Sequence, residues 1–355
     1  MPRFTNRSQQ VAEHLRAELL NGRWRDFMPG VLRLERELGV NRATVETALR
    51  ILEEDGLLVG QGAGKRRRVQ VPEAELKPRP LLLRCLPYEK ADSEVGYISA
   101  LTHLLDEKGI RFQFARSTLT DLGMNPNRVA TLVKRTTADA WMVISGSREV
   151  LKWFADQPIP TLAMFGRFIG LPMAAASPRK TPAVQEVVRR LVALGHRRIV
   201  MLVQEERRKP KPAFAEQAFL DELEAHGIKT GSYNLPDWGK GPEDFHRGLD
   251  TLFQLTPPTA MIIVEPKLFA AAKDHLAQRG IIAPRDISLV CDDPDPTFKW
   301  HNPAISHMRW DPQLLIRRVA RWAENIAQGK EDLGQTLLKA EFVEGGTIGP
   351  VPSAR

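Results

Sequence analysis

The sequence predicts an α/β protein in which a winged helix-turn-helix domain, residues 1–71, is followed by a linker, 72–80, and a two-lobed domain with doubly wound parallel sheets, 81–352. Three observations lead to this prediction. Two short amphipathic helices flank a break near Gly39, a glycine-rich basic hairpin follows them, and the rest of the chain alternates between strand and helix patterns.

The chain begins with a helix pattern from about residue 8 to residue 21. Its apolar positions Val11, Leu15 and Leu19 share one face, and Gly22 is a typical helix stop. We expect this helix to cover the pair that follows it.

The stretch 28–58 is expected to form that helix pair. Asn41 is a good N-cap for the second helix, whose apolar stripe of Val45, Ala48, Leu49 and Leu52 predicts the buried side. The opposite face begins with short and basic residues, as in the recognition helix of a helix-turn-helix. Two amphipathic helices joined at a glycine also describe an ordinary helical hairpin, so this stretch alone leaves both interpretations open.

A basic hairpin behind the second helix favours the first interpretation. Leu57, Leu58 and Val59 read as a strand, and Val69 and Val71 as its partner. The turn between them carries four consecutive cations, Lys65, Arg66, Arg67 and Arg68. Such a run is most often a solvated surface, but directly behind a candidate recognition helix it predicts a DNA-binding wing.

Composition narrows the function classes. The net charge is +8 with a pI near 9.6, which favours a polyanionic partner. Cys85 and Cys291 lie in apolar runs without metal-ligand spacing, so we expect buried free thiols, no metal and no cofactor. No secretion signal or membrane-length apolar run is present, so a cytoplasmic protein is expected.

The sequence offers no basis for an enzyme. It contains no nucleophile elbow, no paired-carboxylate cluster and no phosphate-binding loop, so no catalytic residue is assigned. The glycine-rich stretch 60–65 lacks the full P-loop spacing and a flanking buried strand. A binding protein for transport is disfavoured, because the sequence has no secretion signal and because it carries the candidate DNA-binding domain at residues 1–71.

Residues 8–71 resemble the N-terminal winged-helix domain of GntR-family bacterial transcription regulators. The resemblance is carried by Met28-Pro29, Leu38-Gly39-Val40-Asn41-Arg42-Ala43-Thr44-Val45, Ala48-Leu49 and Glu54-Asp55-Gly56-Leu57. It implies that the start of the recognition helix meets DNA and that the glycine-rich wing tip enters the minor groove. The expected DNA-contacting residues are Asn41, Arg42, Ala43, Thr44, Glu46, Arg50, Gly62, Gly64, Lys65, Arg66 and Arg67.

Two departures from the GntR pattern bear on DNA contacts. Gly30, Val31 and Leu32 stand where the family often has serine, glutamate and arginine, so a usual arginine contact is absent. Glu46 stands where many members carry arginine. Near phosphates Glu46 would repel; alternatively it accepts a hydrogen bond from a cytosine amino group.

Residues 72–80 hold three prolines and no apolar period, which predicts the linker. Two consecutive β/α series then predict two lobes. We expect the first lobe to comprise about 81–175 and 306–330, and the second about 176–305 and 331–350, with SYNL at 232–235 among the strands of the second.

The part from about 80 to 350 resembles the periplasmic-binding-protein-like (type I) effector domain of the LacI/GalR family. The sequence motifs that carry this resemblance are Leu194-Gly195-His196-Arg197-Arg198-Ile199, Asp237-Trp238, Pro284-Arg285-Asp286-Ile287-Ser288-Leu289-Val290 and Asp292-Asp293. It implies a ligand in the crevice between the lobes. His196, in a helix end leading into a strand, is expected to be structural.

The same resemblance implies an aromatic stacking residue, Trp238, and a hydroxyl-accepting carboxylate, Asp292. The expected effector-contacting residues are Tyr88, Glu94, Ser145, Arg167, Trp238, Glu265 and Asp292. The family's arginine in the second lobe is replaced by Ala215, and its asparagine-aspartate pair by Glu265-Pro266. A neutral sugar is therefore not the only candidate: Arg167, Arg179 and Lys180 together would favour a sugar acid or phosphate.

These patterns predict a transcription regulator, expected to be a repressor, that binds a palindromic operator in double-stranded DNA. By analogy with both families we expect a homodimer, formed through the first lobe and the face of helix 95–108. A small-molecule effector, a sugar or sugar derivative, is expected to control it. The alternative is an effector-independent regulator whose crevice has lost ligand binding.

Overall fold

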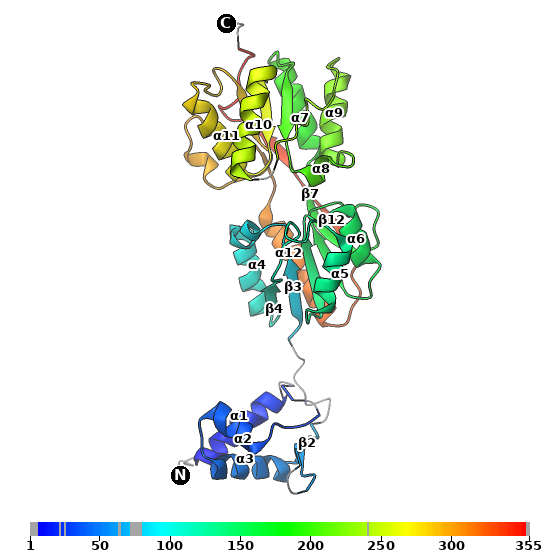
Figure 1. Ribbon diagram of the computed structural model, residues 1–355, viewed down its shortest axis with the longest axis vertical. Coiled ribbons are helices and arrows are strands. Elements are labelled where there is room, and N and C mark those ends of the chain that lie inside the picture. Colours follow the sequence, from blue (N-terminus) through cyan, green and yellow to red (C-terminus); the bar gives the residue numbers. More distant parts are fainter. Residues whose placement is uncertain are drawn as a thin grey trace. The chain divides into compact units, whose positions relative to one another are not determined.

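The computed structural model describes residues 6–20, 23–24, 26–62, 65–71, 80–239 and 241–352. The chain divides into two compact units, Met1–Pro80 and Leu81–Arg355, each of which is described by itself (Figure 1). Apart from Pro80, the predicted linker lies outside the described residues.

The N-terminal unit contains three helices, α1 (Arg7–Leu20), α2 (Val31–Leu38) and α3 (Arg42–Glu54), among its described residues. Gly39, with φ +61°, turns the chain between α2 and α3 in the left-handed conformation that glycine adopts without strain. The predicted stripe is buried: Val45, Ala48, Leu49 and Leu52 pack against α1 and α2 in one core. The predicted helix-turn-helix is therefore present.

A small wing follows the helices. Strands β1 (Leu58–Val59) and β2 (Arg68–Val69) pair antiparallel, and Phe27 adds a bridge to Arg68. A two-stranded ribbon of this size is not stable alone. Here Leu57 and Leu58 pack into the helical core, which anchors the ribbon.

The first lobe of the C-terminal unit is built on a six-stranded parallel sheet in the order β12-β7-β6-β5-β3-β4. The strands are β3 (Leu82–Leu86), β4 (Arg111–Phe114), β5 (Ala140–Ile144), β6 (Thr161–Met164), β7 (Ala174–Arg179) and β12 (Gln335–Lys339). Side chains of α4 (Gly96–Glu107) and α12 (Pro312–Ala327) pack on one face, and those of α5 (Pro126–Lys134) and α6 (Arg148–Ala155) on the other. A short 3-10 helix, η1 (Lys90–Glu94), precedes α4.

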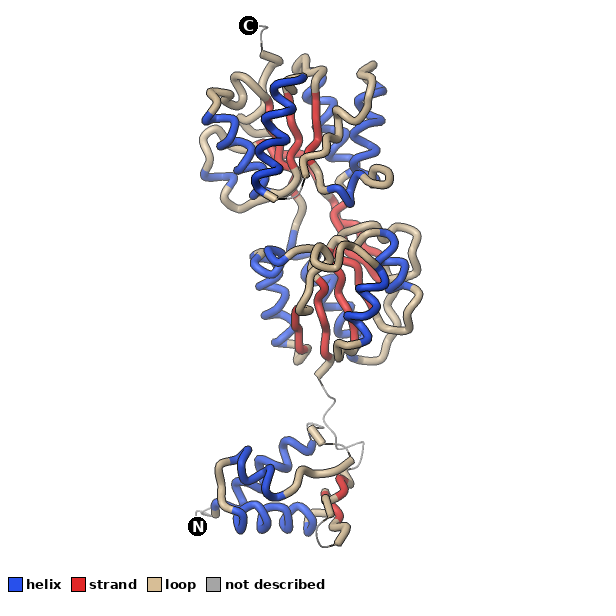
Figure 2. Tube along the Cα trace, viewed as in Figure 1, coloured by secondary structure: helices blue, strands red, loops and turns tan. Residues whose placement is uncertain are grey.

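The second lobe has a five-stranded sheet in the order β13-β11-β10-β9-β8, parallel except for β13. Its strands are β8 (Ile199–Leu202), β9 (Ala260–Ile263), β10 (Ser288–Cys291), β11 (Ser306–Arg309) and β13 (Glu341–Val343). Helices α7 (Thr181–Ala193) and α9 (Phe214–Ala225) cover one face, and α10 (Pro242–Leu255) and α11 (Pro266–Gln278) the other. The short elements α8 (Glu205–Arg208) and η2 (Phe298–Trp300) lie in loops, and Figure 2 shows both sheets in red between their helices.

The chain passes between the lobes after β7, after β11 and after β12. The predicted division is wrong at these points, because β11 joins the second sheet although 306–330 was assigned to the first lobe. Likewise β12, and β7 beyond residue 175, join the first sheet although both were assigned to the second lobe. Pairing with β10 or with β7 decides sheet membership, and this non-local choice leaves no local pattern in the sequence.

One predicted strand is absent. Residues 232–235 form a turn, and Asn234 is buried within it. The Asn234 carbonyl accepts from the Met201 amide at 2.8 Å, and its side chain donates to the Ile199 carbonyl at 2.9 Å. The turn thereby caps the exposed edge of β8, which satisfies backbone groups that an unpaired edge leaves open.

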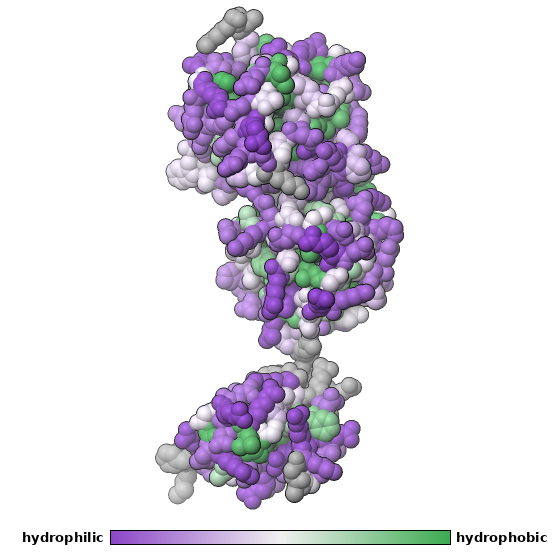
Figure 3. Space-filling view, viewed as in Figure 1, coloured by the Kyte–Doolittle hydropathy of each residue, from purple (hydrophilic) through white to green (hydrophobic). Residues whose placement is uncertain are grey.

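The predictions for the two cysteines and for His196 fit the structure. Cys85 and Cys291 are buried free thiols, and His196 is buried with its ring near the Gly349 carbonyl and the Ser288 hydroxyl. The face of the molecule drawn in Figure 3 is mainly hydrophilic. Among the described residues, no helix combines the length and apolar character that crossing a membrane requires.

Candidate nucleic-acid interface and interlobe crevice

The recognition helix is fixed at its N-terminus by Asn41. Its side-chain oxygen accepts from the Thr44 amide at 2.9 Å, which satisfies one of the amides left open at a helix start. Asn41, Arg42 and Ala43 are exposed, whereas Thr44 is half-buried. The cap thus orients the first turn of α3 with its predicted DNA-contacting residues toward solvent.

The exposed face of α3 carries a row of alternating charges, Arg42, Glu46, Arg50 and Glu54, at intervals of one turn. Arg42 Nε donates to Glu46 Oε1 at 2.8 Å, whereas Arg50 Nε lies 3.9 Å from Glu54 Oε1. The first pair is a hydrogen bond, and the second is only a loose ion pair. The hydrogen bond and charge of Glu46 raise the pKa of the Arg42 guanidinium, so Arg42 stays a cation.

The wing contributes unevenly. Gly62, with φ +96°, forms its turn, Gly64 lies outside the described residues, and Lys65 and Arg66 are exposed. Arg67 differs from them, because its Nε donates to Glu53 Oε1 of α3 at 2.7 Å and the pair is only 26% and 29% exposed. Arg67 therefore holds the wing against α3, whereas Lys65 and Arg66 are exposed to solvent.

Four of the predicted effector residues gather around the segment 204–211 of the second lobe, which contains α8. They are Tyr88, Arg167, Glu265 and Asp292. Each lies in a loop just beyond the carboxyl end of a strand, namely β3, β6, β9 and β10. Such strand ends are where ligands bind in open α/β sheets.

Asp292 directly follows β10 and is fully buried. Its Oδ2 accepts from Lys180 Nζ at 3.1 Å and from Arg207 Nη1 at 3.0 Å. Burial raises the pKa of Asp292, but the two cations outweigh it and hold that pKa below its usual range. Its Oδ1 is also buried and accepts no hydrogen bond from the described residues, so one acceptor position in the crevice stays open.

Arg207 from α8 is the main residue that sequence reasoning missed. Besides Asp292 it pairs with Glu216 Oε1 at 2.5 Å, and Glu216 is 1% exposed. Burial lowers the pKa of Arg207, but the surrounding carboxylates raise it by more, so the guanidinium is charged. Arg207 thus places a charged arginine beside Asp292, whereas the position at which the family resemblance implied an arginine is Ala215. The four-residue helix that carries it has no periodic signal in the sequence.

Side chains of the two lobes contact each other directly near these strand ends. Tyr88 Oη donates to Glu206 Oε2 at 2.9 Å. Arg167 Nε donates to the Glu206 carbonyl at 2.9 Å, and its Nη2 donates to the Lys211 carbonyl at 2.6 Å. In addition, Lys267 of the second lobe forms an ion pair with Glu89 of the first lobe. Burial raises the pKa of the Tyr88 hydroxyl, with Glu206 adding to the effect, so Tyr88 remains a donor.

Arg167 and Ser145 come from two loops in close contact. Gly166 has φ +83°, and a Cβ there would lie 2.6 Å from the Gly146 carbonyl oxygen, so only glycine fits. The Arg167 amide donates to the same carbonyl at 3.1 Å. This packing holds the backbone at Gly166 and Arg167 against the backbone of Ser145 and Gly146.

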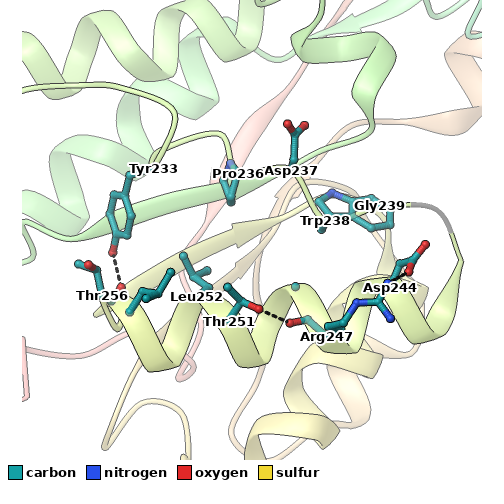
Figure 4. A pocket seen from close by; sticks show the side chains of 12 residues that line it. Tyr233, Pro236, Asp237, Trp238, Gly239, Asp244, Arg247, Thr251, Leu252 and Thr256 are labelled. Carbon is teal, nitrogen blue, oxygen red and sulfur yellow. Dashed lines mark hydrogen bonds and ion pairs between the residues drawn. The ribbon is translucent and has the colours of Figure 1, made fainter.

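The other predicted effector residues lie apart from this group. Glu94 is exposed at the end of η1. Trp238 donates from Nε1 to the Val203 carbonyl at 3.0 Å and packs edge-to-face on Phe245. Trp238 lines a hollow of about 560 Å³ between the segment 233–239 and α10 in the second lobe, with Tyr233 at the opposite end (Figure 4).

An aromatic cluster that the sequence did not predict lies near Asp293. Tyr97, Phe165 and Trp310 contact each other edge-to-face with ring centroids 5.9–6.4 Å apart, and Trp310 Nε1 donates to Asp293 Oδ1 at 3.1 Å. The sequence offered no signal for this cluster, because its members come from three distant segments.

The expected anion-binding trio does not assemble. Lys180 is 11% exposed and pairs with Asp292 and Asp293, at 3.1 and 2.7 Å. Two donors of Arg167 are taken by carbonyls, and Arg179 is exposed. In the part of the chain that the structure describes, no group of three or more His, Cys, Asp or Glu side chains is arranged to hold a metal.

Comparisons with known proteins agree with this geometry. Residues 7–64 match the family of bacterial regulatory proteins, gntR family, and residues 188–348 match the periplasmic binding protein-like domain. No curated protein sequence matches the chain.

Solved structures share the fold. They include a transcriptional regulator CelR–cellobiose complex, with 17% identity and TM-score 0.60 over 90% of this chain and 100% of that chain. The lac repressor dimer bound to operator and the anti-inducer ONPF has 17% identity and TM-score 0.60, over 79% of this chain and 99% of that chain. A LacI family regulator from Enterococcus faecium with bound ribose has 14% identity and TM-score 0.59, over 76% and 98%.

At these identities the structural likeness establishes the fold, and the two matched families establish the domain types. The chain is therefore a DNA-binding transcriptional regulator that joins a helix-turn-helix domain matching the gntR family to a periplasmic-binding-protein-like effector domain with the fold of LacI-family regulators.

Proposed function

We propose that this regulator represses transcription by binding a palindromic operator through α3 and the wing, with Arg42 and Asn41 reading bases. The observation that carries this proposal is the exposed first turn of α3, capped by Asn41, together with the exposed Lys65 and Arg66 of the wing, which is attached to the other end of the helix at Glu53. We take residues 1–71 as the DNA-binding domain, 72–80 as the linker and 81–352 as the effector domain.

Selection from a randomised duplex library tests the DNA-binding proposal. The wild-type protein should enrich an inverted repeat, and Arg42→Ala should weaken binding to the enriched duplex about tenfold or more if Arg42 makes a bidentate base contact. Enrichment of no sequence would contradict the proposal. Reporter expression from the enriched duplex, with and without the protein, then distinguishes repression from activation.

A palindromic site implies a homodimer, since a two-fold protein matches a two-fold operator. We propose that the first lobe and the exposed face of α4 form the interface. Sedimentation equilibrium of the wild type tests this. Introducing Ser99→Arg and His103→Glu, two exposed α4 positions, should shift the protein toward monomer, and an unchanged mass would refute the interface.

We further propose that a hydroxyl-rich small molecule binds in the crevice at Asp292. The open Oδ1 of this buried carboxylate supports a ligand hydroxyl donor there. Several acids also lie close together here: Glu89, Glu206 and Glu265 interact with Tyr88, and Glu89 and Glu265 interact with Asp92. This concentration of negative charge favours a neutral effector over an anionic one. Related folds hold cellobiose and ribose, so sugars are the first class to test.

The alternative is an effector-independent regulator, and a specific observation supports it. Arg207 occupies Oδ2 of Asp292, while Tyr88 and Arg167 already join the two lobes. A thermal-shift screen against neutral sugars, sugar acids and sugar phosphates separates the two possibilities, because a ligand that binds only the folded state raises the melting temperature. A shift that Asp292→Asn abolishes supports the effector; no shift with any class supports the alternative.

A further inference from the structure

Glu46 is an unexpected residue on a surface that meets a polyanion. It is 46% exposed on the same face of α3 as Arg42, where a carboxylate repels phosphates. Its contact with Arg42 explains the position in another way. The Nε–H of Arg42 is engaged by Glu46 at 2.8 Å, and the guanidinium is otherwise exposed at the start of the helix.

The geometry of this contact selects which edge of Arg42 remains available. A guanidinium has five N–H donors, one on Nε and four on the two Nη atoms. With Nε bound to Glu46, the outer edge formed by Nη1 and Nη2 remains, and two parallel donors are what guanine O6 and N7 accept. The carboxylate also restrains a long side chain that would otherwise lose conformational entropy on binding DNA.

Charge gives a second reason. If Arg42 turned to a phosphate, Glu46 would be carried close to the same negative group, and the two would repel. At a guanine edge this repulsion is smaller, because O6 and N7 are neutral acceptors whereas a phosphate carries a full negative charge. Glu46 therefore weakens the binding of Arg42 to phosphates more than its binding to bases, so the protein discriminates better between DNA sequences at some cost in affinity.

We propose that Glu46 is a positioning residue that holds Arg42 through its Nε–H and makes Arg42 a guanine reader at one position of each half-site. This inference rests on the proposed function, because it assumes that α3 lies in the major groove. It assigns Glu46 a role through Arg42 rather than a direct contact with a cytosine.

The second ion pair of the same row provides a matched control. Arg50 and Glu54 have the same spacing and are both 68% exposed, but their atoms are 3.9 Å apart and they lie two turns further from the helix start. Glu54→Gln thus removes the same charge from α3 without releasing Arg42. A change common to both variants reflects net charge, and a change specific to Glu46 reflects positioning.

Selection from a randomised duplex library is carried out with the wild type, Arg42→Ala, Glu46→Ala, Glu46→Gln and Glu54→Gln. The wild type should enrich guanine at one symmetric position, and Arg42→Ala should lose that preference. Glu46→Ala should reduce the discrimination at this position about tenfold and strengthen binding to unrelated duplex. Glu46→Gln keeps an acceptor for Nε and should restore part of the discrimination, whereas Glu54→Gln should leave it unchanged.

Two results would overturn the inference. One is Glu46→Ala enriching the same sequence with wild-type discrimination, and the other is Glu54→Gln causing an equal loss. Loss of preference at a different base pair, with the Arg42-dependent guanine retained, would assign Glu46 a direct base contact and equally refute positioning. Failure of the wild type to enrich any duplex is a different result, since it overturns the proposed function itself.

Discussion

Replacing Arg207 should lower the stability of the effector domain far more than replacing an arginine that is hydrogen-bonded equally well at the surface. Arg207 contacts Asp292 at 3.0 Å and Glu216 at 2.5 Å, and these carboxylates are 0% and 1% exposed. In Arg207→Met, Glu216 loses this cation and Asp292 keeps only Lys180. Breaking a buried ion pair in this way costs about 3–5 kcal/mol, because the remaining charge cannot be solvated.

Arg190→Met is the matched control. Arg190 binds Glu344 through two hydrogen bonds at 2.8 and 2.7 Å in the same lobe, but both side chains are 44–45% exposed. Exposed pairs contribute about 0–1 kcal/mol, since water and salt screen them. For a domain of this size 1 kcal/mol corresponds to about 2–4 °C in melting temperature. We therefore expect Arg207→Met to lower the Tm by about 6–20 °C and Arg190→Met by less than about 4 °C.

Differential scanning calorimetry and urea unfolding measure both variants at pH 7. The double variant Arg207→Met, Glu216→Gln removes one of the two uncompensated charges and should recover part of the loss. If Arg207→Met melts within about 1 °C of Arg190→Met, the reasoning from burial is wrong and the crevice charges are solvated.

Three further predictions follow from the contacts described above. Burial, with the nearby acids, raises the pKa of Asp92 to about 6, so the neutral form of Asp92 is the one that stabilises the fold. The stability that Asp92 contributes is fully present below its pKa in the unfolded chain and is lost as the pH rises through about 6. Asp92→Asn should remove this loss in urea titrations from about pH 4 to 7. Lys65→Ala with Arg66→Ala should flatten the slope of log affinity against log salt by about 0.9 per lost phosphate contact, and an unchanged slope would show that the wing stays off the backbone. Tyr88→Phe combined with Arg167→Ala should lengthen the distance between spin labels placed one on each lobe, whereas Arg190→Ala should not. Equal distances in the wild type and both variants would show that Tyr88 and Arg167 do not hold the lobes together.

Much of the DNA-binding domain follows from local sequence. Asn41 as the cap, Gly39 as the turn and the stripe ending at Leu52 all depend on residues within a few positions of each other, and the structure has them as predicted. The role of Arg67 does not follow in this way. Its partner Glu53 is 14 residues away, so only the fold shows that this wing cation pins the wing rather than facing solvent.

The crevice depends on tertiary structure to a greater extent. The strand ends carrying Tyr88, Arg167, Glu265 and Asp292 were identifiable, because parallel sheets place such loops together. Their partners were not: Arg207 lies on a helix of one turn, and Glu206 binds a tyrosine 118 residues earlier. The charge of the crevice therefore differs from expectation, since Lys180 is neutralised by a carboxylate pair more than 100 residues away.

The sequence by itself determined the helix-turn-helix, the wing and the β/α alternation, because each depends on residues close together along the chain. The tertiary structure alone decided which sheet β11 and β12 join, which cations are free and which are paired, and that α8 connects the lobes. These are contacts between distant segments, where burial and charge, rather than local periodicity, select the partner.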